Sequence, residues 1–221
     1  RALIGMSIFY AVMHLIAYAV LSPRFATGFV LDQTAQAALS VTVLLSFTMM
    51  LSQAMESVTR AFYARDDLDL ILSSPAPSRD LFLVRIVMMA LTSWAMSALV
   101  ISPFLNVAVV LGGEHWLAGY VVLLAVSLNA TGAGVLITLA LFRTVGAQRT
   151  RFYAQILATV VGAAFLIGMQ VVAILSFGSM SRFTLFDPAF LASHAPGEGS
   201  PWWFLAHTVA GQTNAVFLFL A

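Results

Sequence analysis

The chain has 221 residues, of which 61% are hydrophobic and 9% are charged, and its formal net charge is +1. Soluble domains are only about half apolar, so this composition excludes them and indicates an integral membrane protein. Ten scattered Arg residues form no basic surface for nucleic acid, the absence of Lys excludes a Walker A loop, and the absence of Cys excludes thiolate metal sites.

Six apolar stretches predict an all-α membrane protein with six transmembrane helices, because about 20 apolar residues cross a bilayer as a helix. We expect these helices at 2–22, 36–58, 84–111, 118–142, 152–178 and 202–221. The first stretch is too long for a signal peptide and lacks a cleavage site of small residues, so it counts as a membrane helix. The whole of 1–221 is expected to be one six-helix domain that belongs to a longer polypeptide.

The connections between the stretches differ in their Arg content. Connections 59–83 and 143–151, with their flanks, carry seven Arg residues and the N-terminus carries one, whereas the other three connections carry two. Because Arg concentrates in cytoplasmic loops, we expect a multi-pass protein of the cell inner (plasma) membrane with a cytoplasmic N-terminus. Trp116, Trp202 and Trp203 then fall at the opposite interface, where aromatic residues are enriched.

The connection 59–83 is a charged island, since nine of the nineteen charged residues lie within 56–85. Asp66 can cap a short helix, Pro75 then stops it, and Ser78 can cap the next one. The apolar positions that share one face of the short helix are Leu68, Ile71 and Leu72. A helix this short is unstable alone in water, so we expect it to dock in a groove of another protein. A solvated loop helix without a partner is the alternative.

The segment 62–87, "FYARDDLDLILSSPAPSRDLFLVRIV", resembles the first cytoplasmic loop of permease subunits from type-2 ABC exporters. The likeness extends loosely to the six-helix layout and to the long connections 59–83 and 179–201. In that family the segment joins the second and third membrane helices and forms a coupling helix that docks on an ATPase subunit. The docking positions that the resemblance implies, with the Pro that stiffens the joint, are Leu68, Asp69, Leu72, Ser73 and Pro75.

The resemblance implies the permease subunit of an ATP-driven exporter, which moves an unknown substrate by alternating access and is not itself an enzyme. The implied partners are a cytoplasmic ATP-binding subunit, a second six-helix permease unit in the same or another chain, and the lipid bilayer, with no nucleic acid. No Asp, Glu or Arg lies near the middle of a predicted span, which argues against a proton- or sodium-driven carrier.

Two other classes of function stay open. One is a structural or assembly subunit of a larger membrane complex that has no transport activity. The other is a haem- or pigment-binding subunit that uses His14 and His207, although each His is more simply a neutral partner of a neighbouring helix. We expect no cofactor, no metal site and no catalytic constellation.

Polar and small residues within the spans predict where helices meet. Amides in membrane helices commonly join helices or line a pathway, and the candidates are Gln53, Asn106, Asn129, Gln155 and Gln170. Glycines that let helices approach closely are expected at Gly132, Gly134, Gly162 and Gly168. The outer connection 179–201 is expected to hold a short helix that starts at Asp187, with an ordinary surface loop as the alternative.

Overall fold

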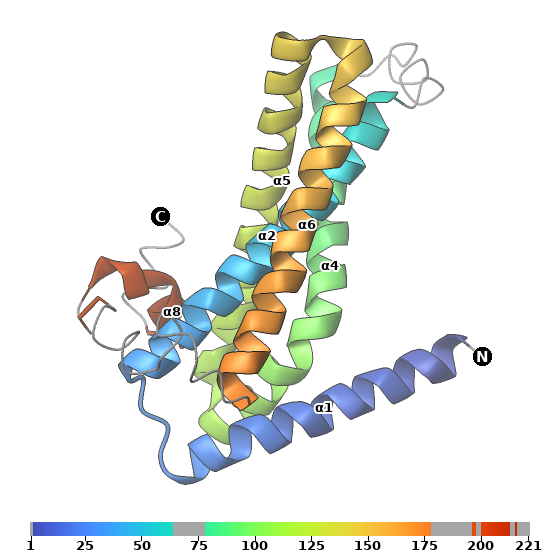
Figure 1. The fold of residues 1–221 in the computed structure, drawn as a ribbon. Helices are drawn as coiled ribbons and strands as arrows, with labels where there is room; N and C mark the ends of the chain where they lie inside the picture. The colour runs from blue at the N-terminus through green and yellow to red at the C-terminus, as the bar shows by residue number, and fades with distance from the viewer. Residues whose placement is uncertain (1, 64–77, 178–195, 198–199, 213–214, 216–221) are drawn as a thin grey trace. The chain divides into compact units, whose positions relative to one another are not determined.

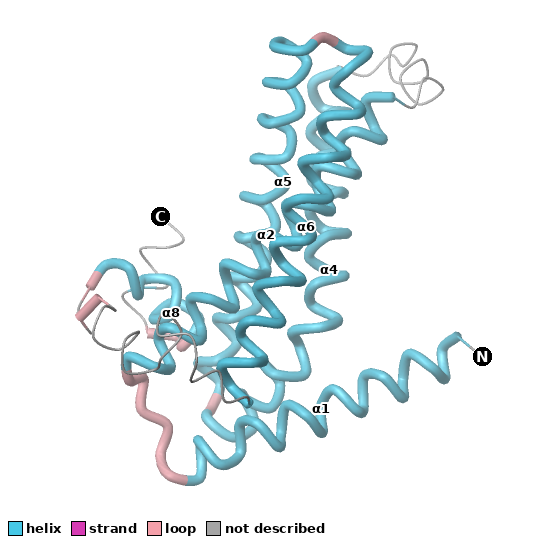
Figure 2. The backbone as a smooth tube through the Cα atoms, in the orientation of Figure 1, coloured by secondary structure: helices cyan, strands magenta, loops and turns pink. Residues whose placement is uncertain are grey.

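The computed structural model describes residues 2–63, 78–177, 196–197, 200–212 and 215 (Figure 1). The described residues are almost entirely helical and contain no strand, in agreement with the predicted all-α fold (Figure 2). The long helices are α1 (Ala2–Ala26), α2 (Gln33–Tyr63), α4 (Ser78–Gly112), α5 (Ala118–Val145) and α6 (Ala147–Phe177). The short elements are the 3-10 helices η1 (Glu114–Leu117) and η3 (Pro201–Trp203) and the α-helix α8 (Phe204–Val209).

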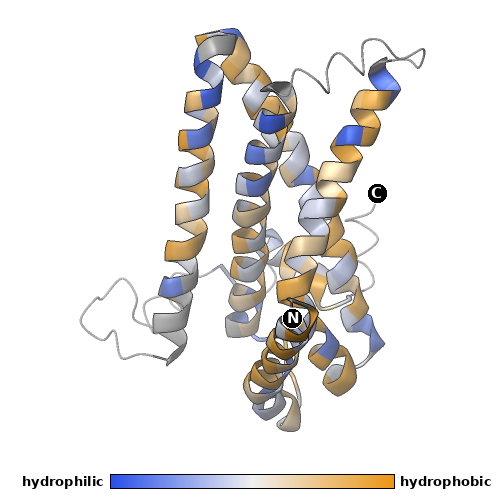
Figure 3. Ribbon diagram, turned by 90° about the vertical axis from the view of Figure 1, so that its right-hand side faces the viewer, coloured by the Kyte–Doolittle hydropathy of each residue, from blue (hydrophilic) through white to orange (hydrophobic). Residues whose placement is uncertain are grey.

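Five of the described helices are long and apolar enough to cross a membrane. Their apolar spans run over Leu3–Ala26, Ala35–Ala61, Arg79–Gly112, Glu114–Val145 and Arg149–Gly168. Each of the first five predicted stretches falls on one of them. Hydrophobic residues recur along these helices, with hydrophilic residues between them (Figure 3). The coarse prediction of a multi-pass helical membrane protein is therefore supported by helix length and composition.

The described residues of 202–221 do not form the single helix that the sequence predicts. There the chain forms η3 and then the six-residue helix α8, which ends at Val209. Gly211 follows with a φ of 72°, and a side chain at this position would collide with the carbonyl of His115. Only glycine adopts this conformation at such close approach without strain, so the range is not one uninterrupted helix. The six-helix count stays a prediction.

Local chemistry sets the helix ends. The backbone N–H of Ala35 donates to Asp32 Oδ1 at 2.8 Å, which caps α2. The predicted connection 143–151 is almost entirely helical, because one residue, Gly146, turns the chain between α5 and α6 with a φ of 79°. The connection between the two helices is therefore shorter than the predicted 143–151, because polar residues do not prevent a helix from continuing.

The chain divides into two compact units. Unit 1 comprises Arg1–Val43, Met96–Leu123 and Ile174–Ala221, and unit 2 comprises Leu44–Ala95 and Leu124–Ala173. In unit 1 the rings of Phe25, Phe29 and Trp116 form a cluster, in which both Phe rings contact Trp116 edge to face with centroids 5.9 and 5.2 Å away. Aromatic contacts therefore join α1 and the following loop to η1.

In unit 2 the helices approach each other at small residues. A Cβ on Gly134 would lie 3.2 Å from Ala54 Cβ and 3.3 Å from the backbone nitrogen of Met55. The buried Ser127 hydroxyl donates to the Ala90 carbonyl at 2.6 Å. Small side chains let backbones come close enough for dispersion and hydrogen bonds to act, which matters where lipid removes the hydrophobic drive between helices.

Two further glycines meet a neighbouring helix in the same way. A Cβ on Gly162 would lie 3.0 Å from Ser52 Oγ, and one on Gly168 would lie 2.5 Å from a methyl carbon of Leu45. Together with Gly134, they confirm three of the four predicted contact glycines. The prediction for Gly132 is wrong, because no described atom lies within 4 Å of the position of its Cβ.

Candidate functional site

The five predicted docking residues, from Leu68 to Pro75, lie outside the described residues, and the coupling helix stays a prediction. The structure describes what flanks them. The helix α2 ends at Tyr63, and α4 begins at Ser78 with Asp80 in its first turn, where an acidic side chain stabilises the helix dipole. Two long helices therefore end at the two borders of the charged segment.

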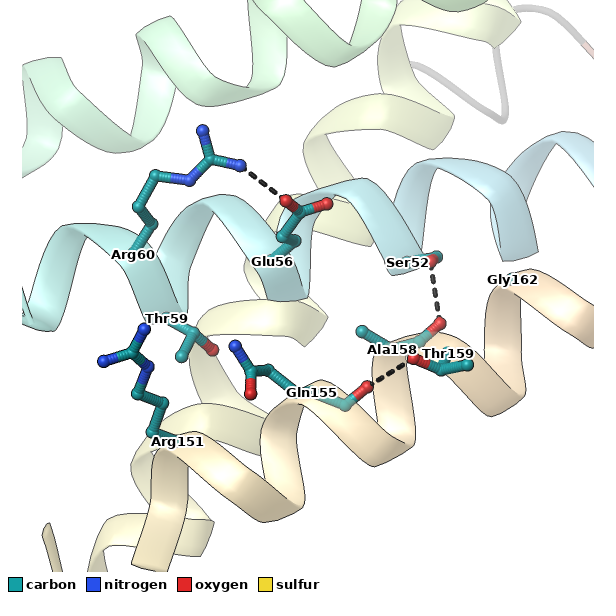
Figure 4. Close-up of a pocket in the computed structure, with 9 residues that line it drawn as sticks. All are labelled: Ser52, Glu56, Thr59, Arg60, Arg151, Gln155, Ala158, Thr159 and Gly162. Carbon is teal, nitrogen blue, oxygen red and sulfur yellow. Dashed lines mark hydrogen bonds and ion pairs between the residues drawn. The ribbon is translucent and has the colours of Figure 1, made fainter. Parts of the chain in front are cut away.

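A cleft of about 700 Å³ lies between α2 and α6 within unit 2 (Figure 4). The volume is in the range of small-molecule sites, which is about 300–1,000 Å³. Its α2 wall consists of Ser52, Glu56, Thr59 and Arg60, and its α6 wall includes Arg151, Gln155, Thr159 and Gly162. On each helix these residues recur every three or four positions, so each wall is one helix face.

One end of the cleft is closed by a direct contact between the two helices. Ser52 Oγ donates to the carbonyl oxygen of Ala158 at 2.8 Å. Gly162 lies against the same hydroxyl, so a larger residue there would push the helices apart. Small residues thus fix the separation of α2 and α6 at this end.

The other end of the cleft is charged. Arg60 donates to Glu56 Oε1 at 2.5 Å, and their side chains are 74% and 64% exposed. An exposed ion pair one helical turn apart stabilises a helix by only about 0.3–0.5 kcal/mol. With Arg151 on the facing helix, the described residues of the cleft wall carry two positive charges and one negative charge. The pair contributes little to the fold, so its charges can be used to bind a ligand.

Unit 1 contains a separate polar cluster between α1, α4 and α5. Asn106 Nδ2 donates to His14 Nε2 at 3.2 Å, and Tyr120 OH donates to Asn106 Oδ1 at 2.7 Å. Tyr10 and Ser102 share a hydrogen bond of 2.8 Å between their hydroxyls. The structure therefore brings two predicted residues, His14 and Asn106, together with three hydroxyls.

These bonds assign the protonation of His14. Its Nδ1 lies 2.9 Å from the carbonyl oxygen of Tyr10, which can only accept, so Nδ1 carries the proton. Nε2 then accepts from Asn106, which requires a neutral ring. Both ring nitrogens are thus engaged in hydrogen bonds, as the simpler of the two interpretations of this residue expects.

The other predicted amides do not converge on one site. Gln53 accepts from Ser93 Oγ at 3.2 Å and so joins α2 to α4. Asn129 is exposed and donates to Ala125 in its own helix, Gln155 lines the cleft, and Gln170 is exposed on α6. All four belong to unit 2, whereas Asn106 belongs to unit 1.

Several residues of these two sites were not predicted from the sequence. They are Tyr10, Ser102 and Tyr120 in the polar cluster and Ser52, Glu56, Thr59, Arg60, Arg151 and Thr159 in the cleft. Pairs of polar residues four positions apart were the available signal, as in Tyr10 with His14 and Arg151 with Gln155. Such pairs mark one polar helix face, although they do not say which helix it meets.

Metal ligation has no support in the described part of the chain. No group of three or more His, Asp, Glu or Cys side chains gathers there. His207 Nδ1 is buried and has no hydrogen-bond partner among the described residues.

Comparisons with models of known protein families, with characterised proteins and with solved structures find no match to this chain.

Proposed function

We propose that the chain is the transmembrane permease subunit of an ATP-driven ABC exporter. The observation that carries the proposal is the segment 62–87, with its resemblance to the coupling loop of type-2 exporter permeases. In this proposal a cytoplasmic ATPase binds Leu68, Asp69, Leu72 and Ser73, and a second six-helix unit completes the transporter. The N-terminus and the segment then lie on the cytoplasmic side of the inner membrane.

The lengths of α2 and α4 support a mechanical role for this segment. The two helices have 31 and 35 residues, which corresponds to about 46 and 52 Å. A bilayer core is only about 30 Å thick, so each helix is longer than a crossing requires. A motor subunit bound between Tyr63 and Ser78 would act on the ends of both helices, which would carry its displacement into the membrane.

The distribution of charge supports an external source of energy. The chain has no Lys, and the acids on the described long helices, Glu56 and Asp80, lie within the last or first few residues of their spans. Carriers driven by ion gradients generally place an acid inside the membrane. A permease powered by another subunit needs none.

The proposal is tested by Leu72→Asp in the full-length protein, co-expressed with a candidate ATP-binding subunit that co-purifies with the wild type. Burial of a Leu side chain is worth about 1.5–3 kcal/mol, so the complex should weaken about ten- to a hundredfold. Co-purification of the ATPase and ATP-driven export should fall together, while the thermal stability of the permease stays near that of the wild type.

Ser193→Asp in the outer connection is the matched control, and it should change neither readout. Loss of folding by Leu72→Asp, with normal ATPase binding per folded molecule, would mean that the segment packs against its own chain. Uptake driven by a proton gradient with the purified chain alone would contradict the proposal outright.

A further inference from the structure

Thr59 is a buried polar residue in the wall of the α2–α6 cleft. It is 5% exposed, and its hydroxyl makes no hydrogen bond with any described residue. Threonines in helices commonly donate to the carbonyl four residues earlier, as Thr92, Thr138 and Thr159 do at 2.8 Å. A buried hydroxyl without a partner is costly, which suggests that the Thr59 hydroxyl binds a ligand.

The residues that face Thr59 across the cleft are donors. Figure 4 shows its side chain directed toward α6, where the side chains of Arg151 and Gln155 lie beside it. Guanidinium groups bind phosphate oxygens through two parallel hydrogen bonds, and amide and hydroxyl groups add further donors. Among the described residues that line the cleft, Glu56 is the one acidic residue, and it already accepts from Arg60. The donor set therefore suits an anionic phosphate group.

Apolar side chains border the same polar face of α6. Phe152, Ile156 and Val160 are 63%, 45% and 58% exposed and form a stripe four residues apart. Each follows directly after one of the polar residues that line the cleft, so the stripe is rotated from the polar face by about 100°. A ligand with a phosphate group and an apolar chain fits this arrangement, because the phosphate can contact the polar face while the chain contacts the apolar stripe.

The position of the cleft along the helices fits the depth of a lipid headgroup. Arg151 lies near the start of one apolar span, Arg149–Gly168, and Arg60 lies near the end of another, Ala35–Ala61. Gly162, at the closed end, is eleven residues beyond Arg151, which corresponds to about 16 Å along the helix. The charged end is thus at the border of the spans, and the closed end lies within them.

We propose that this cleft binds an anionic phospholipid, or an amphiphile of the same chemistry. Its phosphate binds Arg151, Thr59 and Gln155, and its acyl chain lies along Phe152, Ile156 and Val160. The site is independent of the proposed export function, because none of its residues belongs to the predicted docking segment.

The test measures binding of dioctanoyl phosphatidylglycerol to the full chain in a neutral maltoside detergent by isothermal titration calorimetry. Saturable binding is expected, and Arg151→Gln should weaken it by about tenfold or more. Arg149→Gln removes the same charge from an exposed position two residues away that does not line the cleft, and it should leave the affinity unchanged. Equal losses in the two variants would reduce the effect to general surface charge and overturn the proposal.

Thr59→Val separates ligand binding from structure. Because the hydroxyl has no partner in the described protein, its replacement by an isosteric methyl should leave the thermal stability in detergent unchanged or higher. Affinity for phosphatidylglycerol should nevertheless fall by about tenfold, since hydrogen bonds to charged groups are strong. Lower stability with unchanged affinity would assign the hydroxyl a structural role and contradict the site.

Two other probes identify the chemistry that the cleft recognises. Dioctanoyl phosphatidylcholine carries the same chains with no net charge, and inorganic phosphate carries the anion without chains. Both should bind at least about tenfold more weakly than phosphatidylglycerol. Phosphatidylcholine lacks the net charge that the Arg side chain attracts, and inorganic phosphate lacks the apolar contacts of the chains. Equal affinity for phosphatidylcholine would exclude recognition of the anion, and displacement of phosphatidylglycerol by inorganic phosphate at equal concentration would exclude an amphiphile.

Discussion

The two units of the chain solve the same problem in different ways. Unit 1 joins α1, α4 and α5 through hydrogen bonds that converge on Asn106, and it gathers aromatic rings around Trp116. Unit 2 joins its helices through close contacts at Gly134, Ser127 and Gly162. In lipid, where apolar burial does not drive helices together, directional bonds and tight packing are the two available means. Unit 2 also contains the cleft and most of the charge of the described residues.

The largest expected effect concerns the membrane sidedness of individual connections. Six of the described Arg residues belong to unit 2, and Trp116, Trp202 and Trp203 belong to unit 1. Because the chain has no Cys, single substitutions can be labelled without background. Thr144→Cys should react with an impermeant maleimide only from the cytoplasmic side of oriented vesicles, and Glu114→Cys only from the opposite side. Labelling of both positions from one side would contradict the orientation.

The next largest effect is expected from overpacking in unit 2. Gly134→Leu places a side chain where Ala54 Cβ and the Met55 backbone already lie, so it should destabilise the fold by about 1–3 kcal/mol. Gly132→Leu introduces the same residue in the same helix where no described atom is within 4 Å, and it should have little effect. Thermal unfolding in detergent measures both. A similar loss in both variants would show that the contact of Gly134 with Ala54 and Met55 is not the cause, because Leu has a higher helix propensity than Gly at either position.

A smaller effect is expected when the hydrogen bonds of unit 1 are removed. Asn106→Leu leaves His14 and Tyr120 without their partner, and it should cost about 1–2 kcal/mol because each bond in a membrane protein contributes about 0.6 kcal/mol on average. Asn129→Leu, at an exposed amide that bonds only to its own helix, is the matched control. If the two variants are equally stable in thermal unfolding, the cluster does not hold unit 1 together.

Hydropathy was sufficient to predict five helices, because long apolar stretches have few alternatives in lipid. Hydropathy failed at 202–221, where one close contact determines the backbone conformation. The stretch from 202 is mostly apolar, and the prediction ran through the polar residues GQTN at 211–214. Nothing in the sequence shows that Gly211 meets the carbonyl of His115, almost a hundred residues earlier in the chain. Hydropathy also overestimated the connection at 143–151, because polar residues continue α5 to Val145 and begin α6 at Ala147.

The sites could be predicted only in part, because the sequence does not show which helix faces meet. Asn106 was found because an amide within an apolar stretch is costly and needs a partner, but its partners depend on which faces of α1 and α5 turn toward α4. Gln155 was named as a polar residue of a span, whereas Arg151 was counted only as a marker of orientation. Its place opposite Thr59 follows from the packing of α2 on α6, which the order of residues in one helix does not contain.

The turn at Gly146 has a consequence for the assembly of the protein in its membrane. One residue separates α5 from α6, and so short a connection makes the two helices antiparallel neighbours, which lie side by side at the turn (Figure 1). Three Arg residues, at 143, 149 and 151, surround this tip. Transfer of each across the hydrocarbon would cost about 2.5–3.5 kcal/mol. The pair is therefore expected to enter the bilayer as a single hairpin whose tip stays on the side where it was synthesised.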